Sequence, residues 1–364
     1  MSALPRFPAL RYADARDDIA VVLLGAGVVG GALLRLLSTG AHGVRLVGLA
    51  NSTRQCVEAD GFKFDGAPAL LARAEVGRSD EALLAALDAS GAERRVVIDA
   101  TASAQTASRH ADWLARGYAV VTANKIAAAS SGDAWRGLRA ACARGAAYGD
   151  AATVGAGLPA LATLRRLHAC GDALVALEGV FSGSLSWLFS QYDGTRPFSA
   201  LLREARAWGY TEPDPRADLS GADVARKLVI LARAAGHAID VDDVAVESLV
   251  PASLRDVDGE TFLARAAELD AGIAARYIAA VGQGCCLRHL ATFDANRRAH
   301  VGLVAVGTDH PAARLSGADN LFALTTQRYR PRPLVIQGPG AGAEITAQAL
   351  LGDVLALAPA RFAA

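Results

Sequence analysis

Short apolar runs alternate with segments of helical periodicity along about the first 155 residues. Four runs have the length and continuity of buried strands: Ile19–Leu24, Val44–Ala50, Arg95–Asp99 and Ala119–Thr122. Apolar residues at helical spacing lie between these runs, over 31–38, 80–90 and 108–116. Because strands that alternate with helices form parallel sheets, the pattern predicts an α/β fold with a doubly wound, Rossmann-type sheet.

The alternation stops near residue 155, and strands and helices are grouped from there on. Helical spacing recurs over 159–169, 200–208, 222–235 and 262–269. Strand-like runs are found at 175–181, 288–293, 301–306, 321–326 and 334–337. This grouping predicts an α+β second domain over 155–336, beside a first domain over 19–154. A last helix over 343–358 is expected to pack back on the first domain with the rest of 337–364.

Charge and cysteine content narrow the class of protein. The 364 residues carry 37 Lys and Arg against 37 Asp and Glu, whereas proteins that bind nucleic acids or anionic membranes carry a basic surplus. The five cysteines form no CxxC pair, which is typical of reduced intracellular thiols and gives no zinc framework. Without a signal peptide or a bilayer-spanning apolar stretch, we expect a cytoplasmic protein that binds neither nucleic acid nor membrane.

Lysine is rare in this chain. Only Lys63, Lys125 and Lys227 among the 37 basic residues are lysines. Because arginine holds its charge and does not release a proton, each lysine is a candidate for proton chemistry. Lys63 lies between two phenylalanines in a predicted loop and receives no role.

A glycine-rich loop follows the first predicted strand and opens the first predicted helix, with the pattern GxGxxG. In that context glycines allow a tight turn and let the backbone approach a pyrophosphate at the helix N-terminus. We therefore expect a dinucleotide there instead of a plain glycine turn. The candidate cofactor-binding residues are Gly25, Ala26, Gly27, Val28, Val29 and Gly30.

The end of the second strand bears on which dinucleotide binds. NAD sites usually place an acidic residue there, for the ribose 2′-hydroxyl. This chain has Asn51-Ser-Thr-Arg54, and the next acidic residue is Glu58. Arg54 could hold the 2′-phosphate of NADP, which we favour over NAD. The alternative is that Arg54 is an exposed loop charge.

The third and fourth strands are followed by polar segments, Asp99–Ser103 and Thr122–Lys125. Ligands bind at the carboxyl ends of the strands in a doubly wound sheet. Lys125 is therefore expected near the nicotinamide; the alternative is an ordinary polar loop.

The most informative stretch runs from 209 to 227 and brings three carboxylates to a lysine. Pro213 and Pro215 preclude a helix at its start, and the pair Ser220 and Asp223 resembles a capping box, so a helix should begin near Gly221. Asp223 and Lys227 are then on one helix face, and Glu212 and Asp218 precede them. One interpretation is a capped surface helix with a weak ion pair. Because the run Leu-Val-Ile-Leu follows, we favour a buried helix whose charged face binds a substrate ammonium group.

Taken together, these segments resemble homoserine dehydrogenase, an NAD(P)-dependent enzyme of threonine and methionine biosynthesis. The matching stretches follow the order of that family: GAGVVG (25–30), ANK (123–125), TVGAGLP (153–159), FSGSLSWLF (181–189), GYTEPDPRADLSGADVARKLVILAR (209–233) and QGPGAGAEITA (337–347). The long 209–233 segment is far more specific than the glycine pattern. The resemblance implies interconversion of L-homoserine and L-aspartate 4-semialdehyde by a homodimer, with 155–336 binding the substrate and forming the dimer.

The resemblance also implies roles for single residues. Lys227 would be the proton donor or acceptor on the substrate oxygen. The other implied site residues are Lys125 and Thr101 beside the nicotinamide, Gly342 at the cofactor, and Glu212, Asp218 and Asp223 at the substrate.

This chain departs from the pattern of the family at two positions. Ala151 stands where the family typically has a carboxylate that contributes to a sodium-like cation site, and Ala217 stands in place of one acid of the pair that ends at Asp218. A monovalent cation would then depend on backbone carbonyls, with Val154, Ala156 and Leu158 as candidates; the loop could equally be a plain turn.

Two other functions stay open. One is another Rossmann oxidoreductase on a related semialdehyde, such as aspartate-semialdehyde dehydrogenase, although that chemistry needs a catalytic thiolate. The other is an inactive relative that senses nucleotides. Because the chain ends soon after its last glycine loop, we expect a monofunctional enzyme with neither a C-terminal regulatory domain nor a fused aspartate kinase.

Overall fold

The computed structural model describes residues 19–40 and 43–357, which pack as two compact units. The first unit contains the described residues of 19–124, 137–150 and 346–357. The second unit contains residues 125–136 and 151–345. By packing, residues 125–136 thus belong with the second unit, although they lie within the first of the two predicted domains.

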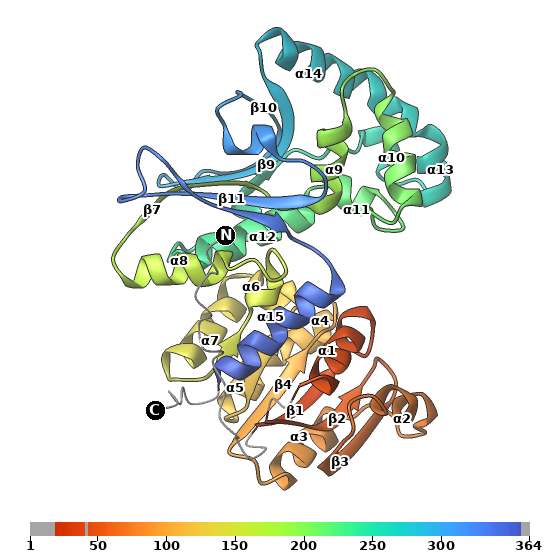
Figure 1. The fold of residues 1–364 in the computed structure, drawn as a ribbon, viewed down its shortest axis with the longest axis vertical. Helices are drawn as coiled ribbons and strands as arrows, with labels where there is room; N and C mark the ends of the chain where they lie inside the picture. The colour runs from red at the N-terminus through yellow and green to blue at the C-terminus, as the bar shows by residue number, and fades with distance from the viewer. Residues whose placement is uncertain (1–18, 41–42, 358–364) are drawn as a thin grey trace, which may run out of the picture. The chain divides into compact units, whose positions relative to one another are not determined.

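The first unit is built on a six-stranded sheet in the order β3-β2-β1-β4-β5-β6, of which Figure 1 labels the first four strands. Its neighbours pair in parallel, except that β2 and β3 are antiparallel. This is the strand order of a doubly wound dinucleotide-binding sheet, so the predicted fold class is confirmed. The strands are β1 (Ile19–Leu24), β2 (Val44–Ala50), β3 (Gln55–Phe62), β4 (Arg94–Asp99), β5 (Ala119–Thr122) and β6 (Tyr148–Gly149).

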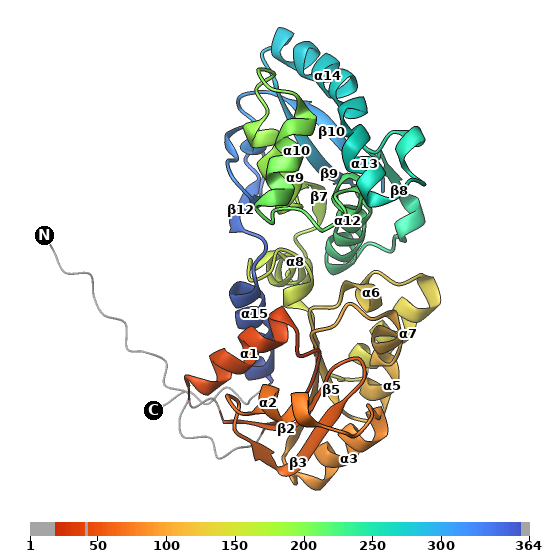
Figure 2. The same cartoon turned by 90° about the vertical axis from the view of Figure 1, so that its right-hand side faces the viewer.

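Helices cover both faces of this sheet. Helix α1 (Val28–Ser38) lies on one face, and α3 (Asp80–Ala89) and α5 (His110–Ala115) lie on the other (Figure 2). The C-terminal helix packs beside β6, since a Cβ added to Gly149 would lie 2.7 Å from the Cβ of Asp353. The other helices of this unit are α2 (Ala67–Arg73) and α4 (Ala104–Ser108), while α7 (Gly132–Ala143) and α15 (Ala343–Ala356) begin in residues of the second unit and continue in residues of the first.

The second unit contains a mixed sheet in the order β12-β11-β7-β9-β10-β8. Its neighbours are antiparallel, except that β8 and β10 are parallel, which fits the predicted α+β class. The strands are β7 (Leu174–Val180), β8 (Val244–Val246), β9 (Cys286–Asp294), β10 (Ala299–Val306), β11 (Asp319–Thr326) and β12 (Leu334–Pro339). The helices are α6 (Lys125–Ala128), α8 (Ala160–Ala169), α9 (Gly183–Gln191), α10 (Phe198–Ala207), α11 (Arg216–Leu219), α12 (Ala222–Ala234), α13 (Gly259–Arg265) and α14 (Asp270–Gly282), with 3₁₀ turns at Ala151–Thr153, Val241–Asp243, Ala252–Leu254, Ala266–Leu269 and Pro311–Arg314.

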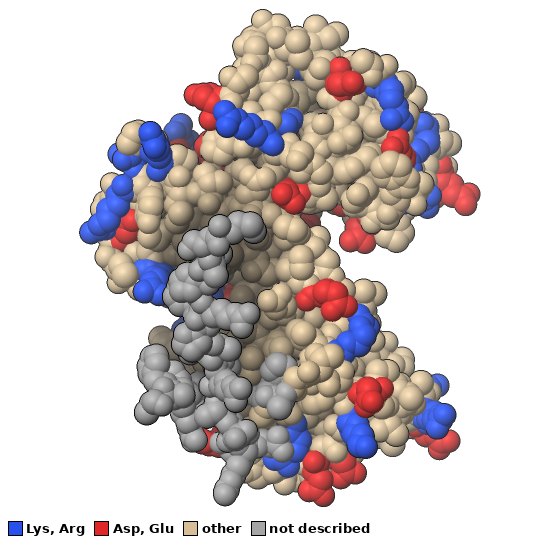
Figure 3. Space-filling model, viewed as in Figure 1, with Lys and Arg blue, Asp and Glu red and all other residues tan. Residues whose placement is uncertain are grey.

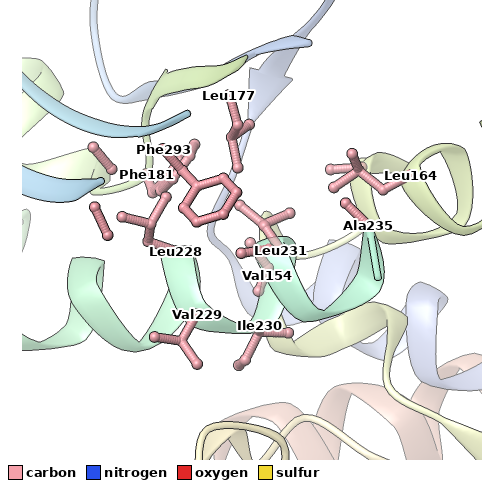
Figure 4. Close-up of a cluster of buried hydrophobic side chains, with 14 of the residues drawn as sticks. Val154, Leu164, Leu177, Phe181, Leu228, Val229, Ile230, Leu231, Ala235 and Phe293 are labelled. Atoms are coloured by element: carbon pink, nitrogen blue, oxygen red, sulfur yellow. The ribbon is translucent and has the colours of Figure 1, made fainter. Parts of the chain in front are cut away.

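Helix α12 lies at the centre of the main core of the second unit. Leu228 and Leu231 face Phe293 of the sheet, and Val229 and Ile230 point to the opposite side of the helix (Figure 4). Each of these four aliphatic side chains is buried. Residues 228–233 are all buried, so packing holds the second half of α12 on every side and makes it a rigid base for the charged residues at the start of the helix.

The surface carries both signs of charge. On the face shown in Figure 3, basic and acidic side chains are interspersed, and no single-sign stripe gathers there. None of the helices in the described part of the chain is long and apolar enough to cross a bilayer.

A buried histidine in the second sheet gives a prediction about acid stability. His289 on β9 is buried, neither of its ring nitrogens has a hydrogen-bond partner among the described residues, and burial lowers its pKa to about 4. In the unfolded chain the imidazole of His289 binds a proton below about pH 6.5, whereas in the native protein it binds the proton only near pH 4. The contribution of neutral His289 to the free energy of unfolding is therefore complete above about pH 6.5. It is lost as the pH falls toward the lowered pKa, by about 3 kcal/mol in total.

We expect His289→Leu to remove this part of the pH dependence. Urea unfolding of the wild type and the variant between neutral pH and about pH 4 measures it. His300→Gln, on the neighbouring strand β10, is the matched control and should leave the slope in place. Equal slopes for the wild type and His289→Leu would show that His289 is charged in the native state.

Candidate active site

The turn between β1 and α1 is shaped by three glycines with different roles. Gly25 has φ +98°, in the left-handed region that favours glycine. At Gly30 a Cβ would lie 1.9 Å from the carbonyl oxygen of Gly25, so only glycine lets α1 pack this closely against the turn. At Gly27, the residue before α1, a Cβ would meet no protein atom within 4 Å.

The first turn of α1 is open in a way that suits an anionic ligand. Gly27 supplies no side-chain cap, and the turn carries no acidic residue. Val28, the first residue of α1, is 79% exposed, so its side chain does not cover the turn. The free N–H groups of the first turn therefore fit the pyrophosphate of a dinucleotide, and this part of the predicted loop has the expected geometry.

The two glycines make a matched pair of variants. Gly27→Ala should leave the stability unchanged, because its Cβ has room, but should weaken dinucleotide binding at least about tenfold by filling the space beside the ligand. Gly30→Ala should lose both the binding and about 1–3 kcal/mol of stability, because α1 must shift. Calorimetric titration and thermal unfolding measure the two effects, with Gly352→Ala in α15 as the control. Normal affinity in Gly27→Ala would contradict the assigned loop.

Arg54 follows the carboxyl end of β2. The Asn51 Oδ1 accepts the backbone N–H groups of Thr53 and Arg54, at 2.9 and 2.7 Å, and shapes the loop. Arg54 is exposed and donates through Nη1 to the carbonyl of Ala72 at 2.8 Å. Within the described part of the chain no carboxylate pairs with this guanidinium, so its charge is available to a phosphate.

A buried polar network at the end of β4 holds the segments that follow β4 and β5. Asp99 is fully buried, and its Oδ1 accepts the backbone N–H and the hydroxyl of Thr101 at 2.9 and 2.7 Å. Its Oδ2 accepts from the amide of Asn124 at 3.0 Å and lies 2.9 Å from the Nε2 of His110. Sequence reasoning expected both polar segments at the carboxyl ends of their strands and gave a role only to Thr101 among these residues; the signal for the network was an aspartate at the end of a buried apolar strand.

The second unit brings two of the three lysines to one carboxylate. The Nζ of Lys227 lies 2.9 Å from the Oδ2 of Asp223 and donates to the carbonyl of Phe181 at 2.7 Å. The Nζ of Lys125 lies 3.6 Å from the Oδ1 of Asp223. The third lysine, Lys63, is exposed. Lys227 is thus directed by two acceptors, and its side chain is only 13% exposed.

Asp223 keeps its charge because of these two lysines. Burial would raise the pKa of its carboxyl, but the positive charges of Lys227 and Lys125 outweigh that effect and lower the pKa below its ordinary value. The carboxylate is 44% exposed and therefore open to a ligand. The Asp223 carboxylate thus lies between the two amines and can orient both of them.

The start of α12 differs from the predicted capping box. Gly221 precedes the helix in the left-handed conformation, with φ +74°, and no side chain caps α12. The Ser220 Oγ instead accepts from the backbone N–H of Ala222 at 3.2 Å. The predicted helix start is confirmed and the capping box is wrong, because the Asp223 carboxylate turns to the lysines and leaves the backbone.

Asp218 is the second carboxylate of the group. Its Oδ1 accepts from the hydroxyl of Ser184 at 2.7 Å, and its Oδ2 accepts from the backbone N–H of Glu212 at 2.9 Å. Burial raises the pKa of Asp218, the two hydrogen bonds oppose this, and the nearby charge of Asp223 adds to it. Glu212 is held beside Asp218 through its backbone and its side chain is exposed.

Sequence reasoning missed two groups of this site, although it quoted the segment that carries them. These are the hydroxyl of Ser184 and the carbonyl of Phe181, at the end of β7 and the start of α9. A serine and a backbone carbonyl give no signal of their own, so only the fold identifies them.

The predicted cation loop and Gly342 belong to the second unit. Gly155 and Ala156 have positive φ, +73° and +51°. The carbonyl of Gly155 accepts from the N–H of Leu158 at 2.9 Å, and the carbonyl of Leu158 accepts from Ala160 at 2.8 Å. Among the described residues, no group of three His, Cys, Asp or Glu side chains could hold a metal. Gly342 lies just before α15 with φ +123°.

Two family models cover most of the chain. Residues 159–355 match the model of homoserine dehydrogenase, and residues 25–148 match the model of the homoserine dehydrogenase NAD binding domain. The chain is 36% identical over 359 residues to the homoserine dehydrogenase of Emericella nidulans, which covers 92% of this chain and 96% of that protein.

Bifunctional proteins are also among the relatives. The chain is 43% identical over 354 residues to the bifunctional aspartokinase/homoserine dehydrogenase 2 of Escherichia coli, which covers 94% of this chain. It spans only 44% of the length of that protein and 39% of the bifunctional protein 2 of Zea mays.

Solved structures share the fold. A crystal structure of a Candida auris protein of unknown function has a TM-score of 0.85 and 34% identity, covering 92% of this chain and 96% of that one. A hyperthermophilic archaeal homoserine dehydrogenase in complex with NADPH has a TM-score of 0.70 at 19% identity, covering 92% of this chain and 96% of that one.

Proposed function

Because the chain belongs to the homoserine dehydrogenase family, we propose that it catalyses the NAD(P)-dependent interconversion of L-homoserine and L-aspartate 4-semialdehyde, in threonine and methionine biosynthesis. The observation that carries the proposal is the Asp223 carboxylate, which lies between the amines of Lys227 and Lys125. Because this carboxylate is half-exposed at the start of a buried helix, it can orient the two amines and still contact a substrate, which an ordinary surface ion pair does not do.

The first unit has what a dinucleotide needs. Its glycine turn leaves the first-turn N–H groups of α1 for a pyrophosphate, and Gly25, Ala26, Gly27, Val28, Val29 and Gly30 would hold it. When bound, the nicotinamide supplies the hydride acceptor for oxidation and the hydride donor for reduction. We assign Arg54 to the 2′-phosphate of NADP, with NAD as the second choice, because its guanidinium has no carboxylate partner in the described chain.

Lys227 carries the proton in this proposal. In the oxidation direction its Nζ accepts the proton of the substrate hydroxyl, and in the reduction direction it returns the proton to the carbonyl oxygen. The carbonyl of Phe181 and the carboxylate of Asp223 direct the Nζ. We assign Lys125 and Thr101 to the nicotinamide end, because Thr101 and Asn124, the residue before Lys125, are bound to Asp99 at the carboxyl end of β4.

The carboxylates bind the substrate. Asp218 is held by Ser184 and by the backbone of Glu212, so its position is fixed before a ligand arrives. We assign Glu212, Asp218 and Asp223 to homoserine, whose ammonium group needs negative partners. Gly342 is assigned to the cofactor, and the carbonyls of Val154, Ala156 and Leu158 to a monovalent cation.

The proposal extends to assembly and location. Following the family resemblance, we assign a homodimer, which light scattering measures directly, and a cytoplasmic location, which fits the absence of a bilayer-spanning helix in the described chain.

The function is tested by incubating the purified chain with L-homoserine and either NADP⁺ or NAD⁺ and following the absorbance of the reduced nicotinamide. We expect homoserine-dependent reduction that needs no phosphate and is faster with NADP⁺. Turnover of L-aspartate 4-semialdehyde that depends on phosphate, without homoserine oxidation, would identify aspartate-semialdehyde dehydrogenase chemistry instead. Cofactor binding without any turnover would identify a nucleotide-sensing relative.

A further inference from the structure

We propose that Arg233 is a positioning residue that fixes Lys125 relative to Asp223 and Lys227. The proposal rests on the proposed function for the role of the two lysines. Arg233 lies near the end of α12, in the helix that carries Asp223 and Lys227 at its other end. Its side chain is 1% exposed, so it is a buried charge that the reaction itself does not use.

The guanidinium of Arg233 binds the segment that follows Lys125. Nη1 donates to the carbonyl of Ala128 at 2.7 Å, and Nη2 donates to the carbonyl of Ser130 at 2.9 Å. The guanidinium carbon lies 4.8 Å from the ring centre of Trp135, over its face. All three contacts fall within 125–136, the segment that packs with the second unit although the chain around it belongs to the first.

The remaining contacts of Arg233 fix the guanidinium itself. Its Nε donates to the carbonyl of Ile239 at 2.9 Å, and its Nη2 lies 2.5 Å from the Oδ1 of Asp240. These two contacts, made with residues that follow α12 in the chain, hold the planar guanidinium in one orientation. The carbonyls of Ala128 and Ser130 are then bound by a rigid donor pair.

Helix α6 is thereby attached to α12 at both of its ends. Lys125, its first residue, contacts Asp223 near the start of α12, and Ala128, its last residue, contacts Arg233 near the end. The first attachment is weak alone, because the two charged atoms are 3.6 Å apart and the side chains of Lys125 and Asp223 are 35% and 44% exposed, so solvent screens the pair. The buried attachment at Arg233 therefore has to supply the orientation of α6.

The planar shape of the guanidinium explains why an arginine, and not a lysine, makes these contacts with the 125–136 segment. A guanidinium offers donors in a planar fork that can bind several acceptors at once and stack on a ring, whereas an ammonium is a point charge. Packing alone would be met by an apolar side chain of similar length, since a buried ion is a poor source of stability. We infer that the bonds from Arg233 specify where α6, and with it Lys125, is placed.

A double-mutant cycle tests the proposal. Arg233→Lys should lower kcat/KM for homoserine oxidation about tenfold in the wild-type background, because a displaced Lys125 is poorly oriented. In the Lys125→Gln background the same change should have an effect of less than about twofold. Arg166→Lys, an exposed arginine on α8, is the matched control. Equal losses in the two backgrounds would overturn the proposal.

Hydrogen exchange gives a readout that needs no activity. In Arg233→Lys, the amides of 125–130 should exchange faster, and those of the sheet of the second unit should not change. Unchanged exchange over 125–130 would overturn the positioning role even where turnover falls. Should Arg233→Lys fail to fold, Trp135→Leu removes the ring beneath the guanidinium and should accelerate exchange in the same segment. Absence of homoserine turnover in the wild type would contradict the proposed function, whereas the exchange result decides the role of Arg233 separately.

Discussion

Replacing Lys227 by arginine is expected to lower kcat for homoserine oxidation by about 10²- to 10⁴-fold, the usual loss when a general acid–base is removed. Arginine can still pair with Asp223 and the carbonyl of Phe181, but it stays protonated at any working pH and cannot accept the substrate proton. If Lys227 transfers the proton, the pH profile of the rate should also differ between the wild type and the variant. Steady-state kcat across pH measures both.

The control for this experiment is Lys63→Arg, because Lys63 is exposed in the first unit and touches neither site. It should keep the wild-type rate and pH profile. If Lys227→Arg also kept both, Lys227 would not be the group that moves the proton.

Asp223→Asn is expected to lower kcat/KM by about 10²-fold, the order of loss that follows misplacement of a catalytic group. The variant leaves Lys227 and Lys125 without the carboxylate that lies between them. Their like charges would then repel, and Lys227 would keep only the carbonyl of Phe181 as an acceptor. Steady-state kinetics with varied homoserine measures the change.

The stability difference between the wild type and Asp223→Asn should depend on pH in a definite direction. The folded-state pKa of Asp223 lies below its ordinary value, so the ion pair stabilises the protein at pH above the ordinary carboxyl range and is lost as the pH falls through the lowered value. Wild type and Asp223→Asn should therefore differ in stability at neutral pH and converge in strong acid. Asp133→Asn, which breaks an exposed pair with Arg136, should change neither activity nor stability. Activity in Asp223→Asn within about threefold of the wild type would contradict the assigned role.

In the sheet of the first unit, the strands whose residues are fully buried could be predicted from the sequence. Every residue of β1 is buried, as are nearly all of β2, so their continuous apolar runs carry the signal of a strand covered on both faces. Strand β3 was missed because it is an antiparallel edge strand whose sequence, QCVEADGF, is mostly polar and partly exposed. Edge exposure removes the apolar pattern that sequence reasoning depends on.

Helices of the second unit show the same limit in another form. Helix α9 was missed, because residues 184–189 are all buried and so show no amphipathic period. Helix α14 is rich in alanine, with only Ile273 and Ala280 buried, and its apolar spacing is too weak to read.

The site was predictable within one helix and not beyond it. Asp223 and Lys227 are one turn apart, so their contact follows from local geometry. The contacts of Lys125 with Asp223 and of Ser184 with Asp218 join distant parts of the chain, and no periodicity encodes them. The capping box failed for a related reason, since long-range lysines compete for the carboxylate that would otherwise cap the helix.

The most direct test of the central claim uses L-homoserine labelled with deuterium at the carbinol carbon, together with NADP⁺ and the purified chain. If Lys227 removes the hydroxyl proton while hydride leaves that carbon, the label should appear in the reduced nicotinamide and the product should react as an aldehyde. Absence of homoserine-dependent nicotinamide reduction, or reduction without transfer of the label, would contradict the account.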